Sequence, residues 1–348
     1  MIRYIPFLLS SLCFGGSLRA IDNGLVLTTA SNLISTPSVS FAPFESWRVS
    51  SSADYDAFPK ACQVSNSEFY IVYKAGVSHA GAGDAIVLKS SNLVDWAEVA
   101  TLTPTAGRTR VQEPDIALAY DGRLQVAARQ AGGAGYLNCI KYSSDGGTNW
   151  TSWITNAIPS NELFYRTEWV GSTNFLIAYS IAQSNVVLYS STDGTNYSEY
   201  ATVMEGTTEG ECAISFDGDL ALGTVRKTST DAGWAVWSTA PYTNWNSSAL
   251  SVSVGGQGAI RFNGKEYVFA RWFTEHGDTD LSANGVCLVT TNSFSPISFP
   301  TPSAISGEYY DGGYGDFLTK DGQLYAVFYA PDDEGTAIYV ARLDIWED

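Results

Sequence analysis

A glutamate and an arginine in the second half of the chain have the types and the spacing to meet at one edge of a β-sheet. Glu211 opens an apolar stretch and Arg226 closes the next one, with Asp217-Gly218 between them. Asp and Gly tolerate the positive φ of a type I′ turn, so strands 211–216 and 219–226 are predicted to form an antiparallel hairpin. At the shared edge the carboxylate and the guanidinium could form an ion pair, because buried or half-buried charge is costly unless it is paired or used.

Similar hairpin signals recur along the chain. Asp121-Gly122, Asn263-Gly264 and Asp321-Gly322 each join two apolar stretches, with weaker signals near Asn66 and Ser172. The units repeat roughly every 50 residues, which is the period of four-stranded propeller blades. They predict an all-β chain folded as a six-bladed β-propeller. Its six inner strands are expected near residues 57–64, 113–119, 165–170, 210–216, 256–262 and 314–319.

A second repeat marks the outer strands. Residues 143–150 read Ser-Ser-Asp-Gly-Gly-Thr-Asn-Trp, which fits the Asp-box pattern Ser-x-Asp-x-Gly-x-x-Trp, and residues 191–197 are a shortened copy. Degenerate copies lie at 90–96 and 238–245. In this pattern the aspartate closes a tight turn onto backbone amides and the tryptophan packs between strands. We therefore expect the aspartates of these turns to be structural.

The last unit, which begins near Tyr314, has three predicted strands and little chain left for a fourth. Residues 24–50 are expected to supply it, so that an N-terminal strand closes the last blade and removes two free sheet edges. The even repeat favours a single domain, residues 21–348, over two ordinary ones. The composition, 45% hydrophobic with 32 glycines, fits an all-β protein rich in turns.

Residues 1–20 have the features of a secretory signal peptide. Arg3 precedes a short apolar run, and small residues follow up to Ala20. The run is too short to span a membrane. We expect the mature protein to be secreted or periplasmic without a membrane span. The alternative is that residues 1–20 form part of the first strand.

The net charge of −17 argues against partners that need a basic surface. Phosphate backbones bind faces rich in lysine and arginine, so nucleic acid is not expected as a partner. The chain has two histidines, and we predict no metal and no cofactor. Cys62, Cys139, Cys212 and Cys287 stand singly in predicted strands, which favours buried thiols, although an exported protein permits disulfides. We expect a monomer.

Polar residues near the ends of the inner strands are candidates for binding a ligand, because these strands converge on the centre of a propeller. On the inner strands the candidates are Asp56, Glu113, Asp115, Arg166, Glu168 and Gln257, and neighbouring strands and loops add His79, Arg129, Arg226 and Arg271. Alternatives stay open for four of them. Glu113 and Asp115 either contact a ligand or hold blades together. Arg166 and Glu168 share a face of their strand, so they either pair with one another or contact substrate.

Three segments resemble the sialidase (neuraminidase) superfamily, in particular its divergent Asp-box (BNR) repeat members, and the likeness extends over nearly all of residues 50–348. The stretch from Glu211 to Arg226 is similar to the segment that supplies a glutamate and the second arginine of a carboxylate-binding triad. Gly256-Gln257-Gly258 resembles the strand Cys-Gln-Gly-Ser of the following blade. Residues 313–329 resemble the strand that carries the nucleophilic tyrosine.

The resemblance implies that Tyr314 and Glu211 act as a nucleophile pair. A neutral phenol approaches an anomeric carbon that bears a carboxylate with less repulsion than an aspartate would. A tyrosine with a pKa of about 10 is a poor nucleophile alone, so the resemblance makes Glu211 its base. The family's acid/base aspartate maps to residues 76–84, where Asp84 and His79 both qualify.

The chain departs from the family at two arginines of the triad. Ala57 stands where the first is expected, and residues 284–291 contain none where the third is expected. We therefore expect an exported glycoside hydrolase that removes a terminal acidic or keto sugar other than common sialic acid from glycans or oligosaccharides. One alternative is a carbohydrate-binding propeller without catalysis. Another is a lyase that cleaves uronic-acid polysaccharides with Tyr314 or His79 as base.

Overall fold

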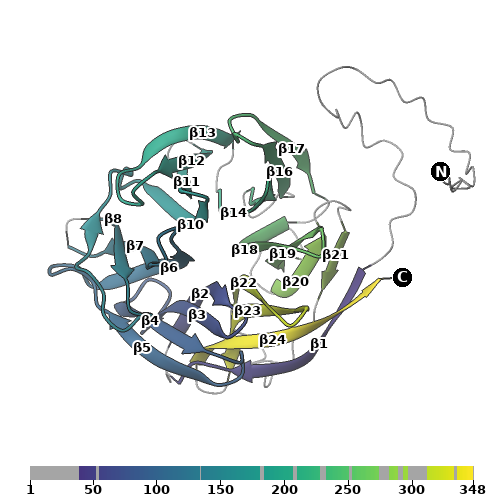
Figure 1. Cartoon of the computed structure of the whole chain (residues 1–348), viewed down its shortest axis with the longest axis horizontal. Helices are drawn as coiled ribbons and strands as arrows, with labels where there is room; N and C mark the ends of the chain where they lie inside the picture. Colours follow the sequence, from purple (N-terminus) through teal and green to yellow (C-terminus); the bar gives the residue numbers. More distant parts are fainter. Residues whose placement is uncertain are drawn as a thin grey trace, which may run out of the picture. The chain divides into compact units, whose positions relative to one another are not determined.

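The computed structural model describes residues 39–51, 55–133, 135–180, 184–206, 210–227, 233–250, 253–273, 282–288, 293–296, 312–332 and 335–347, and all their regular elements are β-strands (Figure 1). Of residues 39–44, 271–273, 282–288, 293–296, 332, 346 and 347 only the backbone is described. Contacts divide the chain into Met1–Thr36 and Pro37–Asp348, and every described strand belongs to the second unit. The expected signal peptide, residues 1–20, lies outside the described residues. The all-β prediction is confirmed.

The strands form six groups of four, and within each group neighbouring strands pair antiparallel. The first three groups are β2 (Tyr55–Ser65), β3 (Glu68–Gly76), β4 (Gly83–Ser90), β5 (Trp96–Leu102); β6 (Arg110–Leu118), β7 (Leu124–Ala131), β8 (Leu137–Ser143), β9 (Ile154–Thr155); and β10 (Glu162–Val170), β11 (Thr173–Ser180), β12 (Asn185–Ser191), β13 (Ser198–Glu205). The other three are β14 (Cys212–Asp217), β15 (Leu220–Val225), β16 (Trp234–Thr239), β17 (Trp245–Ala249); β18 (Ser253–Phe262), β19 (Lys265–Phe273), β20 (Ser282–Leu288), β21 (Ser293–Pro296); and β22 (Gly313–Lys320), β23 (Gln323–Asp332), β24 (Gly335–Glu347), β1 (Val39–Arg48).

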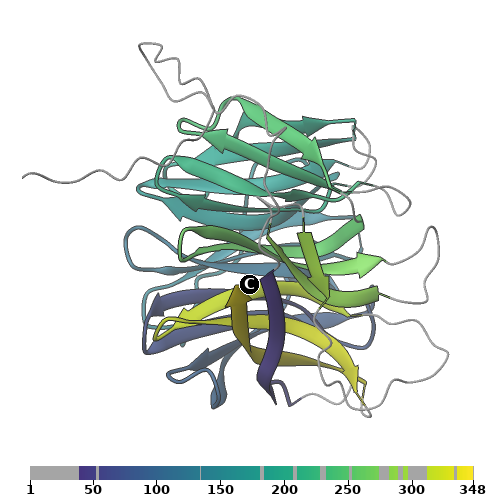
Figure 2. The same ribbon diagram turned by 90° about the vertical axis from the view of Figure 1, so that its right-hand side faces the viewer.

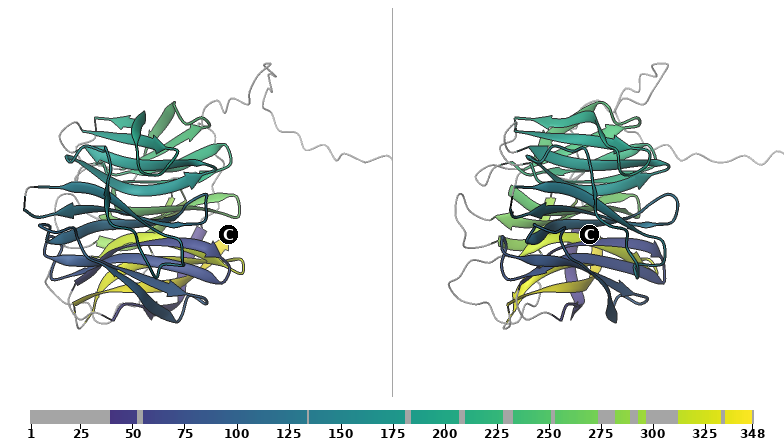
Figure 3. Two further views of the ribbon diagram at one scale, coloured as in Figure 1. Left: turned by 60° about the vertical axis from the view of Figure 1, so that its left-hand side comes forward. Right: turned by 90° about the vertical axis from the view of Figure 1, so that its left-hand side faces the viewer.

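The first strands of the six groups contact one another in sequence. β2 contacts β6, and the contacts continue through β10, β14, β18 and β22, which in turn contacts β2. Figure 1 shows these strands around the centre of the molecule, and Figure 3 turns the side of β4 to β8 toward the viewer. Each lies where an inner strand was expected. In the last group β1 pairs antiparallel with β24, as Figure 2 shows for the purple and yellow strands. This is the pairing expected of an N-terminal strand that completes the group.

Both faces of a sheet are buried, because each group packs against the groups before and after it. Along β3, Phe69, Ile71 and Tyr73 belong to one apolar cluster. The alternate residues Tyr70 and Val72 belong to another. Successive side chains of a strand point to opposite faces, so a continuous apolar stretch supplies two cores.

The turn residues set the register of the hairpins. Asn263-Gly264 and Asp321-Gly322 form the expected two-residue turns, with positive φ at all four residues. The prediction at Asp217-Gly218 was wrong by one position. Asp217 pairs with Leu220, so Gly218 is the first turn residue, with φ 58°. The observed register puts Glu211 opposite Arg226, whose backbone N–H donates to the Glu211 carbonyl at 2.8 Å.

Five of the six first strands carry a register shift at a similar distance from the hairpin that follows. We call the residues at these shifts the bulge residues: Phe58 on β2, Glu113 on β6, Tyr165 on β10, Gly256 on β18 and Tyr314 on β22. All except Tyr165 have positive φ, between 45° and 61°. A bulge re-aims a side chain and bends its strand. The shift therefore re-aims the chain at a similar position in five of the six first strands.

Directly after the bulges lies a layer of buried charge, which we call the central ion network: Lys60, Asp115, Arg166 and Asp316. The Asp316 carboxylate accepts from the backbone N–H of Ala61 at 2.9 Å and from Arg166 Nη1 at 2.8 Å. Asp115 accepts from the backbone N–H of Thr167. Lys60 Nζ donates to the carbonyl of Gln257 at 3.0 Å. The network thereby joins five of the six first strands.

At the outer edge, the Asp-box turns are closed by their own side chains. Asp145 Oδ1 accepts from the backbone N–H of Asn149 at 2.8 Å, and these hydrogen bonds lower the pKa of Asp145 to about 2. Trp150 Nε1 donates to the carbonyl of Gly147 at 2.8 Å, and the tryptophans of two degenerate copies repeat this bond. Asp145 and Asp193 are structural, as expected.

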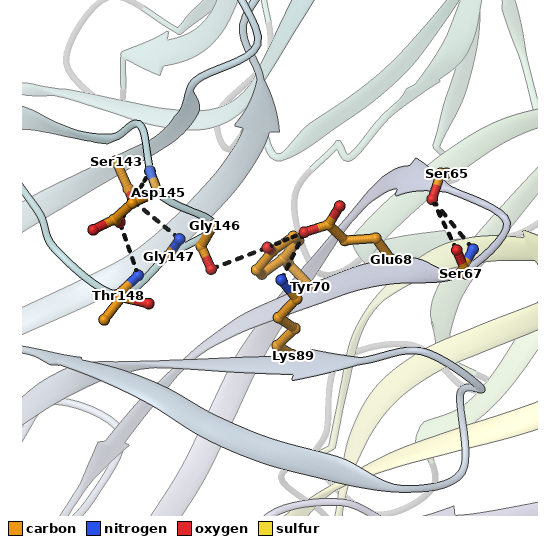
Figure 4. Close-up of polar contacts among 10 residues, drawn as sticks. All are labelled: Ser65, Ser67, Glu68, Tyr70, Lys89, Ser143, Asp145, Gly146, Gly147 and Thr148. Carbon is orange, nitrogen blue, oxygen red and sulfur yellow. Dashed lines mark hydrogen bonds and ion pairs between the residues drawn. The ribbon is translucent and has the colours of Figure 1, made fainter.

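A tyrosine of the preceding group holds the first of these turns. The Tyr70 hydroxyl lies 3.0 Å from the carbonyl of Gly146 and 2.6 Å from Glu68 Oε1, which also binds Lys89 at 2.7 Å (Figure 4). Tyr142 reaches Gly194 in the same way, and Tyr200 reaches Pro241. Successive groups are therefore joined at the outer edge as well as at the centre.

Cys62, Cys139 and Cys212 are buried free thiols, as expected, and the side chain of Cys287 lies outside the described part. Across the described ranges, no helix is long and apolar enough to cross a membrane.

We predict that Asp316→Asn lowers the free energy of unfolding by about 3 kcal/mol, because it leaves the mostly buried Arg166 guanidinium without its closest counter-ion. Urea denaturation measures this. The control is Glu45→Gln, which breaks a half-exposed ion pair with Arg342 at 3.6 Å and should cost less than about 1 kcal/mol. Equal effects of the two substitutions would show that the central ion network does not stabilise the fold.

Candidate active site

Glu211 is the residue around which the candidate site is built. It directly precedes β14 and is 4% exposed. Its Oε1 accepts from the Tyr314 hydroxyl at 2.5 Å, and its Oε2 accepts from the backbone N–H of Gly256 at 2.8 Å. Arg226 Nη1 lies 3.2 Å from the same Oε2. The carboxylate thus meets a hydroxyl, an amide and a guanidinium from three other strands or strand ends.

The bulge of β22 aims Tyr314 at this carboxylate. Tyr314 has φ 45°, and its ring lies 4.8 Å from Phe58 and 6.3 Å from Tyr165, between ring centroids. Gly256 makes the approach possible, because a Cβ there would lie 2.8 Å from the backbone nitrogen of Tyr314. Neighbouring aromatic rings and a missing side chain therefore fix the phenol.

A phenol that donates to a buried carboxylate is arranged for proton transfer. When the phenol oxygen attacks an electrophile, its proton can pass along the 2.5 Å hydrogen bond to Glu211. Arg226 and the Gly256 amide stabilise the Glu211 carboxylate and hold its orientation. We call the phenol and the carboxylate that accepts its hydrogen bond the Tyr314–Glu211 pair.

Glu113 is a second carboxyl group of this region. Burial and, to a smaller extent, the nearby Glu211 raise its pKa to about 7, against the opposing charges of Arg129, His79 and Lys60. Its Oε2 is shielded from solvent and makes no hydrogen bond to the described residues. A carboxyl group in these surroundings can exchange a proton near neutral pH.

The charges of His79 and Arg129 act on Glu113. The His79 ring packs edge-on against Phe58 at 4.8 Å, and its Nδ1 lies 3.3 Å from the Tyr55 hydroxyl. Arg129 is buried and stacks over Tyr136, with Cζ 3.4 Å from the ring centroid. Burial lowers the pKa of Arg129, and Glu113 acts against this shift.

Asp84, the other acid/base candidate, is placed differently. It lies near the start of β4 opposite Ala75, and burial raises its pKa. No charged group of the Glu211 region contributes to that shift. Its catalytic role stays a prediction from the resemblance.

Of four further candidates, two belong to the central ion network and two lie near it. Asp115 binds the Thr167 amide, and Arg166 binds Asp316 at 2.8 Å. Glu168 lies 3.9 Å from Arg166, which is the pairing left open from the sequence. Burial raises the pKa of Asp115 to about 6 and that of Glu168 to about 7. Gln257 Nε2 donates to the Glu211 carbonyl at 3.3 Å and so helps to fix the backbone of Glu211.

The last two candidates are not brought to Glu211 by any described contact. Asp56 is fully buried on β2, and its charge acts on Tyr73. Arg271 pairs with Gly255 through its backbone, and its side chain lies outside the described part.

Sequence reasoning missed four residues of the site and of the ion network. Phe58 and Tyr165 pack around Tyr314, and Lys60 and Asp316 are buried charges below it. Lys60 and Asp316 stand within apolar stretches of predicted inner strands, which is a readable signal, because a buried charge needs a partner. Phe58 and Tyr165 have no comparable signal in a chain with 13% aromatic residues.

No protein-family model matches the chain, and no curated protein matches it in sequence. Solved structures do match. A Dyadobacter fermentans protein of unknown function has a TM-score of 0.72 at 14% identity, over 88% of this chain and 99% of that one. A Penicillium chrysogenum α-L-arabinanase complexed with arabinobiose has 0.61 at 13%, over 88% and 98%. A mutant Trypanosoma rangeli sialidase with trans-sialidase activity has 0.60 at 12%, over 83% and 54%.

These likenesses establish the fold. The chain is an all-β protein whose fold is similar to that of the sialidase and arabinanase structures. The chain spans about half of the Trypanosoma sialidase and nearly all of the arabinanase.

We predict that Gly256→Ala lowers the free energy of unfolding by about 1–3 kcal/mol more than Gly264→Ala does. Both glycines have positive φ, 61° and 75°, so alanine pays a similar backbone cost at either position. A Cβ at 256 also collides with the Tyr314 backbone, whereas one at 264 meets nothing within 4 Å. Urea denaturation of both variants measures the difference. Equal losses would mean that Gly256 does not position Tyr314.

Proposed function

We propose that this chain is an exported, sialidase-like glycoside hydrolase that removes a terminal sugar from glycans with the Tyr314–Glu211 pair as its nucleophile. The observation that carries the proposal is the 2.5 Å hydrogen bond from the Tyr314 hydroxyl to the buried Glu211 carboxylate. The fold shared with sialidase and arabinanase structures supports it. The neighbouring contact of Glu211 with Arg226 also matches the segment that resembles sialidases.

The proposed sugar is acidic or a keto sugar. Arg226 and Arg129 would supply positive charge beside the phenol, and a neutral nucleophile suits a carbon that bears a carboxylate. Common sialic acid fits less well, because Ala57 replaces one arginine and Arg166 binds Asp316 in the ion network.

The proposal includes the architecture and the location of the protein. A six-bladed propeller, with β1 completing the last blade, would bring the bulge residues of the first strands to one central site. Residues 1–20 would direct export to the periplasm or the medium, where glycans are available, and the protein would act as a monomer without a metal.

A carbohydrate-binding propeller without catalysis is the second candidate. The observation that favours it is the incomplete arginine triad, because each missing charge-assisted contact removes roughly 1.5–3 kcal/mol of carboxylate binding. A lyase acting on uronic acids would instead give an unsaturated product that absorbs ultraviolet light.

We predict that the purified protein releases a saturated monosaccharide from a panel of glycans and aryl glycosides, detected by mass spectrometry. Tyr314→Phe and Glu211→Gln should each lower kcat/KM at least about 10³-fold, because they remove the nucleophile or its base. The control is Tyr70→Phe, which removes a tyrosine hydroxyl at the outer edge and should keep activity.

Circular dichroism and thermal unfolding establish that the variants fold. Folded variants with full activity would exclude the nucleophile pair. Glycan binding without any product from the wild type would favour the binding propeller, and an unsaturated product would favour the lyase.

A further inference from the structure

Glu113 has the position on β6 that Phe58, Tyr165 and Tyr314 have on their own strands. Each stands at the register shift of a first strand. β6 contacts β2 on one side and β10 on the other, so Glu113 lies between Phe58 and Tyr165 in the order of the bulge residues. Both of those rings lie beside the ring of Tyr314. The repeat therefore brings the Glu113 carboxyl into the same layer as the Tyr314–Glu211 pair.

The two glutamates of this layer have different surroundings. The Glu211 carboxylate binds Arg226, the Gly256 amide and the Tyr314 hydroxyl. The Glu113 Oε2 is buried and has no hydrogen bond within the described part of the chain. A buried carboxyl oxygen without a donor favours the protonated form, whereas one with a guanidinium and an amide favours the ionised form. Glu113 can thus act as an acid and Glu211 as a base.

Charged groups from several elements face Glu113. They are Glu211 before β14, Arg129 on β7, Lys60 on β2 and His79 in the loop after β3, with the phenols of Tyr165 and Tyr179 on β10 and β11. Burial raises the pKa of both phenols, and Glu113 contributes to each shift. These phenols therefore stay neutral near pH 7.

We propose that Glu113 is the general acid, and in the second step the general base, of the hydrolysis proposed above, on which this assignment rests. In the first step the Tyr314 oxygen bonds to the anomeric carbon and its proton passes to Glu211. The glycosidic C–O bond breaks, its electron pair stays on the leaving oxygen, and Glu113 protonates that oxygen. In the second step Glu113 takes a proton from water, and the water oxygen bonds to the anomeric carbon. The bond from that carbon to the Tyr314 oxygen breaks, its electron pair stays on the Tyr314 oxygen, and this oxygen recovers its proton from Glu211.

This assignment differs from the one that the resemblance implies, in which Asp84 or His79 is the acid. Asp84 shows no electrostatic coupling to the charged groups of the Glu211 region, whereas Glu113 is coupled to Glu211 directly. His79 packs edge-on against Phe58, and its charge lowers the pKa of Glu113. A bulge residue is also fixed more firmly than one in the loop of residues 77–82.

The test compares leaving groups. Aryl glycosides of the sugar that the wild type releases are made with a good leaving group, 2,4-dinitrophenol, and a poor one, 4-methylphenol. Glu113→Gln should lower kcat/KM about 10²–10⁴-fold for the methylphenyl glycoside and much less for the dinitrophenyl glycoside, which needs no proton. Added azide should restore turnover and give a glycosyl azide. The alkaline limb of the wild-type pH profile, near pH 7, should disappear.

The matched control is Glu266→Gln. Glu266 is also buried, burial raises its pKa to about 9, and its Oε1 also makes no hydrogen bond to the described residues. The charges that act on it are those of Glu168, Arg261, Arg166 and Asp217. This substitution should have a small effect on kcat/KM, and the effect should be the same for both glycosides. If Glu113→Gln does not fold, Glu113→Asp should show the same dependence on the leaving group.

The outcomes separate the two proposals. If the wild type releases no sugar, the proposed function fails and the role of Glu113 fails with it. If the wild type hydrolyses both glycosides and the Glu113 variant loses the same factor on each, without azide product, only the role of Glu113 is overturned. The same leaving-group test on His79→Ala or Asp84→Asn would then identify the acid.

Discussion

The buried carboxylate of Asp316 is the interaction on which the centre of this protein depends. It joins β22 to β2 through the Ala61 amide and to β10 through the Arg166 guanidinium. A buried ion is costly unless it is paired and hydrogen-bonded, and Asp316 meets both conditions. Lys60 and Asp115 extend the same layer to β18 and β6. These contacts fix the positions of the first strands relative to one another.

The relative positions of the first strands matter because the site is made from single residues of several strands. Directly above the ion network, the bulges place Phe58, Glu113 and Tyr314 in left-handed backbone conformations. Such conformations cost about 1–3 kcal/mol each and persist only where the surrounding structure holds them. The ion network below and the tyrosine contacts at the outer edge provide that support. The Tyr314 phenol and the buried Glu211 carboxylate can then meet.

The turns and the alternating strands could be predicted from the sequence, because their causes are local. Asn263-Gly264 and Asp321-Gly322 adopt positive φ readily, and the Asp-box aspartates bind amides of their own turn. The Asp217 hairpin shows the limit: the same residues allow two registers, and pairing with β16 and the packing of the sheet select one. The meeting of Glu211, Arg226 and Tyr314 was expected, and the structure brings all three together.

The bulges could not be predicted, since Phe58, Glu113 and Tyr314 are not residues that favour positive φ. From the sequence, only Ala57 was noted in this part of β2, at the place where the resemblance to sialidases implies an arginine. In the structure the bulge of β2 follows Ala57, so the Phe58 ring packs against Tyr314 and Lys60 joins the central ion network. For the same reason the sequence could not separate Glu113, at a bulge, from Asp115, below it. Long-range packing between strands decides these positions.

The most direct test of the account is to trap the glycosyl enzyme. Wild-type protein would be incubated with a fluorinated glycosyl fluoride of the sugar that it releases, digested at low pH and mapped by tandem mass spectrometry. The account predicts one added glycosyl group on the peptide that contains Tyr314, attached to the tyrosine oxygen. A label on Glu211 or Glu113, or inactivation without a label on Tyr314, would contradict it.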